Sequence, residues 1–470
     1  MEQLEAALAA FAGFMWGPPL VVLLVGGGIF FTLHSHLTHF RYFGHSIDLL
    51  RGKYNSESSS AGGDISHYRA LATALAGTMG LGNITGVAVA ITVGGPGAIF
   101  WMWVTAVVGS STKFYTASLA IMYRGYDDSG KLQGGPMYVI REGLGRKWLP
   151  LAWMFALAGM VGTLPVFQIN QLVQILRDLI AIPAGLATSE QHFGFDFTAG
   201  ILLAIVVFSI AIGKIKRVSA VAAGMVPVMV VFYFVITAIL LLSHLERIPG
   251  MFALIFSDAF SGDAVSGGLI GAVILIGVQR GAFSNEAGIG TESLAHGAAK
   301  TNEPAREGLV AMLGPILDTL VVCTCTALAL LVTGVWQGDA TGVTMTTQAY
   351  EQAFPGFGSY LLLLMVFVLS MTTVLTYWYY GSKCMGFLFG TAREKYYMWA
   401  YMALITVGAV ASMEAVINLL DGVYAMMAIP TMLSTLLLAP QVRTAARDYF
   451  KRLEDGDFEE TSSSSELSEI

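Results

Sequence analysis

The feature that most constrains this chain is a succession of apolar segments long enough to cross a lipid bilayer. A membrane-spanning helix needs about 20 consecutive, mostly apolar residues. Only 12% of the residues are charged, against about 25% in ordinary soluble domains. The sequence therefore predicts an all-α, multi-pass membrane protein with eleven transmembrane helices. The predicted segments are about 14–33, 69–96, 98–123, 148–177, 197–213, 218–243, 265–297, 306–334, 358–381, 396–412 and 415–438.

The basic residues predict how these segments are oriented. Loops on the cytoplasmic side carry an excess of Lys and Arg. If the N-terminus lies outside, all but four of the 25 Lys and Arg residues fall in cytoplasmic stretches. Arg177 and Arg247 then lie outside, and Lys113 and Arg280 lie within segments. We therefore expect a protein of the cell membrane with its N-terminus outside and its C-terminus in the cytoplasm.

The chain divides into one membrane domain, residues 1–440, and a tail, residues 441–470. The tail is acidic and rich in serine, so we expect it to be cytoplasmic and disordered. It also accounts for much of the formal charge of −7, which therefore gives no indication of nucleic-acid binding. The sequence gives no indication of the oligomeric state.

The second and seventh segments differ from the others because glycines and polar residues interrupt them near their middles. Each opens a group of five segments, about 69–243 and about 265–438. An odd number of spans in each group inverts the second group relative to the first. This pattern is typical of secondary transporters, which bind substrate and ion near the bilayer midplane between two such repeats.

The first interruption reads "AGTMGLGNITG", residues 76–86. Unwound backbone at membrane depth is tolerated only where it is buried in protein or lines a cavity. The freed carbonyls, with the Thr78 and Asn83 side chains, suit a small hard cation such as Na⁺. The amide groups that follow suit a carboxylate, because they open a new half-helix. The alternative is that the glycines only allow close helix packing.

The second interruption reads "GVQRGAFSNEAGIGTES", residues 277–293. Charged side chains inside a span are costly unless they are paired, so Arg280 and Glu286 could pair with each other or with Lys113. For Arg280 and Lys113, a buried ion pair that only fixes packing is an equal alternative. For Asn285 and Glu286 we favour a role in the site or in gating. Phe283, in the same stretch, is a candidate lid or wall over the substrate.

Polar residues in three other spans are further candidates. Gln168 and Asn170 lie on different faces of the fourth span, so we expect one of them to reach the cavity. Asp318 in the eighth span could neutralise a bound cation or carry a proton, or could serve packing alone. Thr372 and Thr373 in the ninth span could bind a second cation, or could bond back to their own helix.

The sequence gives no indication of an enzyme. It contains no glycine-rich loop followed by Lys and Ser or Thr, the pattern that binds nucleotide phosphates. We therefore expect no cofactor apart from a coupling ion. Cys323, Cys325 and Cys384 fall in or beside apolar segments, where small packed residues are the favoured interpretation.

Several stretches resemble the family of sodium:alanine symporters, also described as alanine or glycine:cation symporters. The stretches are "GTMGLGNITGVAVAI", "GGPGAIFWMWVTAVVG", "QGGPMYVI", "RGAFSNEAGIGTES" and "LDTLVVCTCTALALL". They occur in the family's order and extend over nearly the whole chain. The resemblance implies the fold of the bacterial leucine transporter, with two inverted five-helix repeats (helices 2–6 and 7–11) after one extra N-terminal helix.

The resemblance also implies a function, namely uptake of small neutral amino acids, chiefly alanine and glycine, coupled to Na⁺ or H⁺. It places Thr78, Gly80 and Asn83 at the amino-acid site and the first cation site. It places the following residues around the substrate or a second Na⁺: Phe283, Ala287 or Gly288, Gln168, Asn170, Thr372 and Thr373. The chain departs from the family at "LTYWYYG", residues 375–381, so Thr376 is a candidate wall residue that alters substrate choice. The alternatives are an H⁺-coupled symporter of another small amino acid and a membrane sensor that does not transport.

Overall fold

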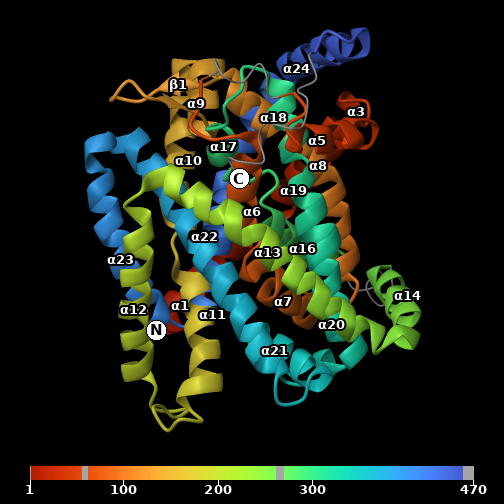
Figure 1. Cartoon of the computed structure of the whole chain (residues 1–470), viewed down its shortest axis with the longest axis vertical. Coiled ribbons are helices and arrows are strands. Elements are labelled where there is room, and N and C mark those ends of the chain that lie inside the picture. The colour runs from red at the N-terminus through yellow and green to blue at the C-terminus, as the bar shows by residue number, and fades with distance from the viewer. Residues whose placement is uncertain (1, 55–61, 261–268, 459–470) are drawn as a thin grey trace.

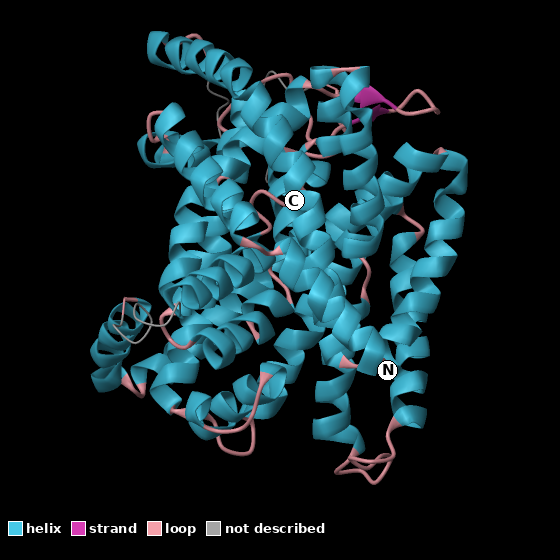
Figure 2. Ribbon diagram, turned by 180° about the vertical axis from the view of Figure 1, so that it is seen from behind, coloured by secondary structure: helices cyan, strands magenta, loops and turns pink. Residues whose placement is uncertain are grey.

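The computed structural model describes residues 2–54, 62–260 and 269–458, and within them the chain is almost entirely helical (Figure 2). The strands in this part of the chain are β1 (Gly125–Tyr126) and β2 (Leu132–Gln133), which pair antiparallel at one end of the molecule. This largely helical architecture agrees with the prediction, because a helix satisfies its own backbone hydrogen bonds where no water is available.

The first half of the described chain contains the N-terminal helices and the first predicted repeat (Figure 1). Its α-helices are α1 (Glu2–Met15), α2 (Pro18–Val21), α3 (Gly27–His34), α4 (Thr38–Arg41), α5 (Phe43–Leu50), α6 (His67–Thr78), α7 (Thr85–Gly94), α8 (Ala98–Met122), α9 (Pro136–Tyr138), α10 (Leu149–Gly162), α11 (Val166–Leu176), α12 (Phe193–Ala211), α13 (Lys214–Leu242) and α14 (Ile248–Ala259). Short π-helical or 3₁₀ turns continue or join them, namely Val22–Gly26, Leu81–Asn83, Val139–Leu144, Arg146–Trp148, Arg177–Ala181 and Leu245–Arg247.

The second half contains the second predicted repeat. Its α-helices are α16 (Leu269–Asn285), α17 (Glu292–His296), α18 (Pro304–Ala311), α19 (Leu313–Pro315), α20 (Thr324–Thr333), α21 (Gly342–Ala353), α22 (Gly358–Phe389), α23 (Glu394–Val410) and α24 (Met413–Asp455). A π-helical turn, Ile316–Cys323, joins α19 to α20, and two 3₁₀ turns occupy Val335–Gln337 and Thr391–Arg393. The first residues of the predicted seventh segment, 265–268, lie outside the described residues.

Six helices or continuous helical runs in the described chain are long and apolar enough to cross a membrane. Two bent pairs raise this number to eight: residues 3–15 with 18–34, bent by 48°, and residues 67–78 with 81–94, bent by 56°. The second bent pair is the predicted broken span. Helices α8, α16 and α23 occupy three further predicted segments. The chain is thus a helical multi-pass membrane protein, and the count of eleven spans stays a prediction.

The two ends of the chain extend beyond the predicted spans. Helix α1 precedes the first predicted segment and packs along α24. Helix α24 continues to Asp455, so residues 441–455 are helical rather than part of a disordered tail. Val442, Ala446 and Tyr449 are buried against the protein, which gives this part of the tail a packed face. The remaining residues of that tail, 459–470, lie outside the described residues.

The broken helix α6–α7 lies at the centre of the molecule (Figure 1). Helix α6 packs against α13 and α22, and α7 packs against α16 and α21. Helix α8 packs in turn along α16 and α18. The two predicted interruptions therefore lie side by side in the core, each surrounded by continuous helices.

Candidate substrate and ion site

The first break separates α6 from α7 between Thr78 and Thr85. Within it, the Asn83 side-chain oxygen accepts a hydrogen bond from the Gly80 backbone amide at 3.1 Å. A Cβ atom on Gly80 would lie 2.7 Å from the Thr373 hydroxyl oxygen of α22, so this position requires glycine. The break thus brings unwound backbone directly against the ninth predicted span.

The second break separates α16 from α17 between Asn285 and Glu292. Three of its residues have left-handed backbone conformations, with φ of +55° at Glu286, +85° at Gly288 and +97° at Gly290. Two are glycines, which adopt this conformation without a steric cost. The third, Glu286, is not a glycine, so its left-handed backbone is strained. Strained residues of this kind cluster at functional sites.

The Asp318 carboxylate joins the two breaks. Its Oδ1 accepts a hydrogen bond from Asn83 Nδ2 of the first break at 2.7 Å. Its Oδ2 accepts one from Ser284 Oγ, at the end of α16, at 2.6 Å, and another from Thr319 Oγ1 at 3.0 Å. All four side chains are completely buried. Carboxylate and hydroxyl oxygens are ligands that hard cations prefer, so this cluster offers oxygens for a cation between the breaks.

Asp318 lies in the π-helical turn Ile316–Cys323, directly after Pro315. π-helical turns within helices are rare and occur often at functional sites. Asn285 also contacts this turn, because its Nδ2 donates to Thr319 Oγ1 at 3.1 Å. The turn therefore faces both the first and the second break.

Glu286 lies in a second polar cluster, with two tyrosines. Its carboxylate accepts hydrogen bonds from Tyr377 OH at 2.6 Å and from Thr291 Oγ1. The Tyr377 hydroxyl lies 2.5 Å from that of Tyr424 in α24. Lys113 of α8 is buried and interacts electrostatically with both Glu286 and Asp318. One lysine thus lies near two buried carboxylates.

Arg280 has a different partner from those predicted. It forms a buried ion pair with Asp421 of α24, rather than with Glu286. Gln279 donates to the same carboxylate oxygen at 2.8 Å. The Arg280 guanidinium also lies 5.3 Å from the centre of the Phe283 ring, the predicted lid. The ion pair therefore lies beside Phe283 and ties α16 to α24.

The other predicted residues fall into two groups. Asn170 is fully engaged, because its Nδ2 donates to the carbonyl oxygens of Gly408 and Ala411 at the end of α23. Gln168 Oε1 and Thr376 Oγ1 are buried and have no hydrogen-bond partner among the described residues. Unpartnered buried polar atoms are uncommon, so Gln168 Oε1 and Thr376 Oγ1 are free to contact a bound ligand.

The remaining predicted positions mostly contact neighbouring helices. Thr372 bonds back to its own helix, whereas Thr373 Oγ1 donates to the Ala76 carbonyl of α6 at 2.9 Å. Thr78 contacts the Leu75 carbonyl of its own helix at 3.5 Å. The Ala287 methyl faces Gly109 of α8, and Gly288 faces Leu24 and Met432.

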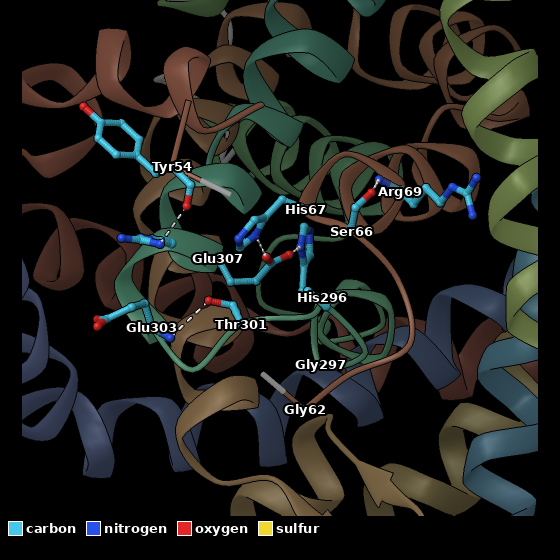
Figure 3. A network of polar contacts seen from close by, with 12 residues as sticks. Tyr54, Gly62, Ser66, His67, Arg69, His296, Gly297, Thr301, Glu303 and Glu307 are labelled. Atoms are coloured by element: carbon cyan, nitrogen blue, oxygen red, sulfur yellow. Dashed lines mark hydrogen bonds and ion pairs between the residues drawn. The ribbon is translucent and has the colours of Figure 1, made fainter. Parts of the chain in front are cut away.

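A separate buried network closes one end of the broken helices (Figure 3). Glu307 of α18 accepts hydrogen bonds from His67, at the start of α6, and from His296, at the end of α17. Arg124 donates to the carbonyl oxygens of Gly297, Ala299 and Thr301. Desolvation by burial lowers the pKa of the Arg124 guanidinium, and the Glu307 charge opposes this shift.

Several of these residues were not predicted from the sequence, although some left a signal. Asp421, Glu292 and Glu307 are acidic residues inside predicted spans, which is by itself an indication of function. Ser284 left none, because a single hydroxyl in an apolar stretch is common. Tyr377 lies in the stretch that departs from the family, 375–381, but its contact with Glu286 could not be read from that departure.

The comparison with a solved structure supports the fold. The chain superposes on the crystal structure of MhsT in complex with L-phenylalanine with a TM-score of 0.60, covering 80% of this chain and 89% of that one. The two sequences are 14% identical, so the similarity concerns the fold alone. It agrees with the predicted leucine-transporter-like architecture.

Curated relatives match over almost the full chain. The sodium/alanine symporter AgcS of Methanococcus maripaludis is 41% identical over 91% of this chain and 93% of its own. Two Bacillus subtilis proteins, named "Probable sodium/glutamine symporter GlnT" and "Amino-acid carrier protein AlsT", are 32% and 33% identical, over 97% and 94% of this chain and 93% and 91% of their own. The family model described as "Sodium:alanine symporter family" matches residues 1–463. The protein is thus a transporter rather than an enzyme, and it belongs to the sodium:alanine symporter family.

Proposed function

We propose that this protein uses the inward Na⁺ gradient to drive uptake of a small neutral amino acid such as alanine or glycine. The observation that carries the proposal is the Asp318 carboxylate, which contacts Asn83 of the first break and Ser284 next to the second. A cation bound there would interact with oxygen atoms near both breaks. Its binding therefore favours the arrangement in which the two broken helices lie together. The name of AgcS, a sodium/alanine symporter, supports the same choice of ion and substrate.

The same geometry supports the following proposed sites. Na⁺ binds near Asn83, Asp318 and the Thr78 end of α6, and Thr373, with Thr372 beside it, provides hydroxyls for a second ion. The amino acid lies along the first break, from Thr78 to Gly80. Its polar groups meet the unpartnered atoms of Gln168 and Thr376, and Phe283 with Ala287 and Gly288 encloses its side chain. Asn170 then supports the site through α23 instead of contacting substrate.

The proposed orientation places the N-terminus outside and the C-terminus in the cytoplasm of a cell-membrane protein. The network around Glu307 then lies at the cytoplasmic end, together with Arg69, Arg124 and Lys300. The Arg280–Asp421 ion pair lies on the opposite side of the breaks. Asn285, Glu286, Arg280 and Lys113 act in gating or coupling between these two ends.

The proposal is tested with the purified protein in liposomes. Labelled alanine should accumulate when Na⁺ is higher outside and should not accumulate without that gradient. Accumulation driven by a pH gradient at equal Na⁺ would instead favour an H⁺-coupled symporter, with Asp318 or Glu286 carrying the proton. Binding of alanine without any accumulation would favour a sensor and would overturn the proposal.

The ion pair beside the lid gives a further prediction. Asp421→Asn leaves the Arg280 guanidinium buried without its anion, a change that costs about 3–5 kcal/mol when the pair is buried. We expect alanine uptake to fall by at least about tenfold, since part of that cost falls on the closed state. The matched control is Trp16→Phe, which removes a neutral hydrogen bond to the Asp421 carbonyl. Equal uptake by the two variants would contradict a gating role.

A further inference from the structure

Glu292 is a buried carboxylate for which the proposed site has no use. It is the first residue of α17, and its side chain is completely buried. Its Oε1 accepts hydrogen bonds from Thr116 Oγ1 of α8 at 2.7 Å and from Ser293 Oγ at 3.3 Å. Its Oε2 is buried without any hydrogen-bond partner in the described chain. The group therefore holds an unsatisfied oxygen inside the protein.

The charged groups around Glu292 all have other partners. Lys113 interacts with Glu286 and Asp318, and Glu286 itself adds repulsion. His296, one turn further along α17, bonds Glu307, and Arg124 bonds backbone carbonyls. No ion pair to Glu292 forms within the described residues. An unpaired carboxylate buried in a membrane protein costs several kcal/mol, so this position calls for a positive charge.

A small cavity lies directly beside the hydroxyls that contact Glu292. Its volume is about 10 Å³, and it is lined by Thr116, Leu119, Pro136, Val139, Ser293, Thr431, Ser434 and Thr435. Five of these eight residues carry hydroxyl groups. Thr431, Ser434 and Thr435 donate their protons to backbone carbonyls of α24 or of Ile289. Their oxygens therefore keep lone pairs for a ligand of about the size of one water molecule.

We propose that Glu292, with Thr116 and Ser293, binds one further positive charge in each transport cycle, carried as Na⁺ or as a proton. Both carry the charge that a buried carboxylate needs, and hydroxyl oxygens suit either one. The inference rests on the proposed function, because it adds a third positive charge to the ions proposed at Asp318 and at Thr372 and Thr373. A zwitterionic amino acid adds no net charge, so each cycle moves three positive charges.

The test measures the ratio of charge to alanine in liposomes, from the membrane potential at which net alanine flux reverses. Glu292→Gln keeps the shape of the side chain and removes its charge. The ratio should fall from about three in the unmodified protein to about two in the variant. An unchanged ratio in a transporting variant would overturn the inference, whereas loss of Na⁺-driven uptake by the unmodified protein would overturn the proposed function itself.

Two further measurements cover a variant that does not transport and identify the ion. Equilibrium binding of ²²Na⁺ to the purified full chain should show one site fewer in Glu292→Gln if the ion is Na⁺. If the ion is a proton, ²²Na⁺ binding stays the same and proton uptake on adding alanine is lost in the variant. Unchanged ²²Na⁺ binding together with unchanged proton uptake would overturn the inference. Thr116→Val should weaken the same binding in the same direction, because it removes one hydroxyl from the site.

Discussion

Replacing Asp318 with asparagine is expected to reduce Na⁺-driven alanine uptake by at least about 100-fold. Loss of a charged partner from a buried site costs about 3–5 kcal/mol, and each 1.4 kcal/mol is a factor of ten. Asparagine also turns an amide N–H₂ group toward Asn83 Nδ2 or Ser284 Oγ, where the carboxylate accepts hydrogen bonds at 2.7 and 2.6 Å. Initial rates of labelled alanine uptake across a range of Na⁺ concentrations measure the effect.

The matched control is Asp196→Asn, another change of a buried aspartate to its amide. Asp196 lies in α12 and pairs with Arg177 and His192, away from both breaks. This control variant, once folded, should reach half-maximal uptake at the same Na⁺ concentration as the unmodified chain. If Asp318→Asn also reaches half-maximal uptake at that concentration, Asp318 does not bind the coupling ion.

Replacing Glu307 with alanine is expected to lower the free energy of unfolding by about 2–6 kcal/mol, because two buried donors lose their acceptor and each such loss costs about 1–3 kcal/mol. Glu307 is completely buried, and in the described network its carboxylate accepts from the Nδ1 atoms of both His67 and His296. Its loss leaves both imidazoles without that acceptor. Unfolding of the detergent-solubilised protein, followed by denaturant titration, measures the change.

Glu303 provides the comparison, because it lies at the start of the same helix, α18, at a more exposed position. Its ion pair with Arg452 is partly solvated, so Glu303→Ala should cost at most about 1 kcal/mol. A similar loss for the two variants would mean that the buried histidine network contributes no more than a surface ion pair.

The positions of the breaks could be predicted from the sequence, because a cluster of glycine and polar residues within an apolar stretch disfavours a continuous helix. Gly80, Asn83 and Glu286 all fall in or at the unwound segments. The family and the helical fold could also be predicted. Which residues serve the ions and the substrate remains a prediction that the experiments above test.

The partners across the fold could not be predicted. The sequence shows that Arg280 needs an anion, but Asp421 lies 141 residues away in the chain. Any buried acidic residue in another span could have paired with Arg280. Charge alone therefore did not distinguish Asp421 from Glu286. Packing decides, because the α16–α24 contact brings Asp421 alone into ion-pair distance of Arg280 in the described structure.

The extent of α24 was underestimated for a related reason. A charged, polar composition after residue 440 is compatible with a solvated helix as well as with a disordered tail. The difference lies in the spacing of Val442, Ala446 and Tyr449, which fall on one face and become buried. Three apolar residues in a charged stretch are too weak a pattern to recognise without the surface that they cover.

This long helix has a practical consequence for protein engineering. Beyond the last span it remains attached, because Arg452 pairs with Glu303 and Phe458 is buried beside Arg306. A truncation at residue 440 would remove those contacts from the start of α18, the helix that also carries Glu307. Affinity tags, fluorescent reporters and thermostabilising fusions are therefore better joined after Phe458, where they leave the Arg452–Glu303 and Phe458–Arg306 contacts intact.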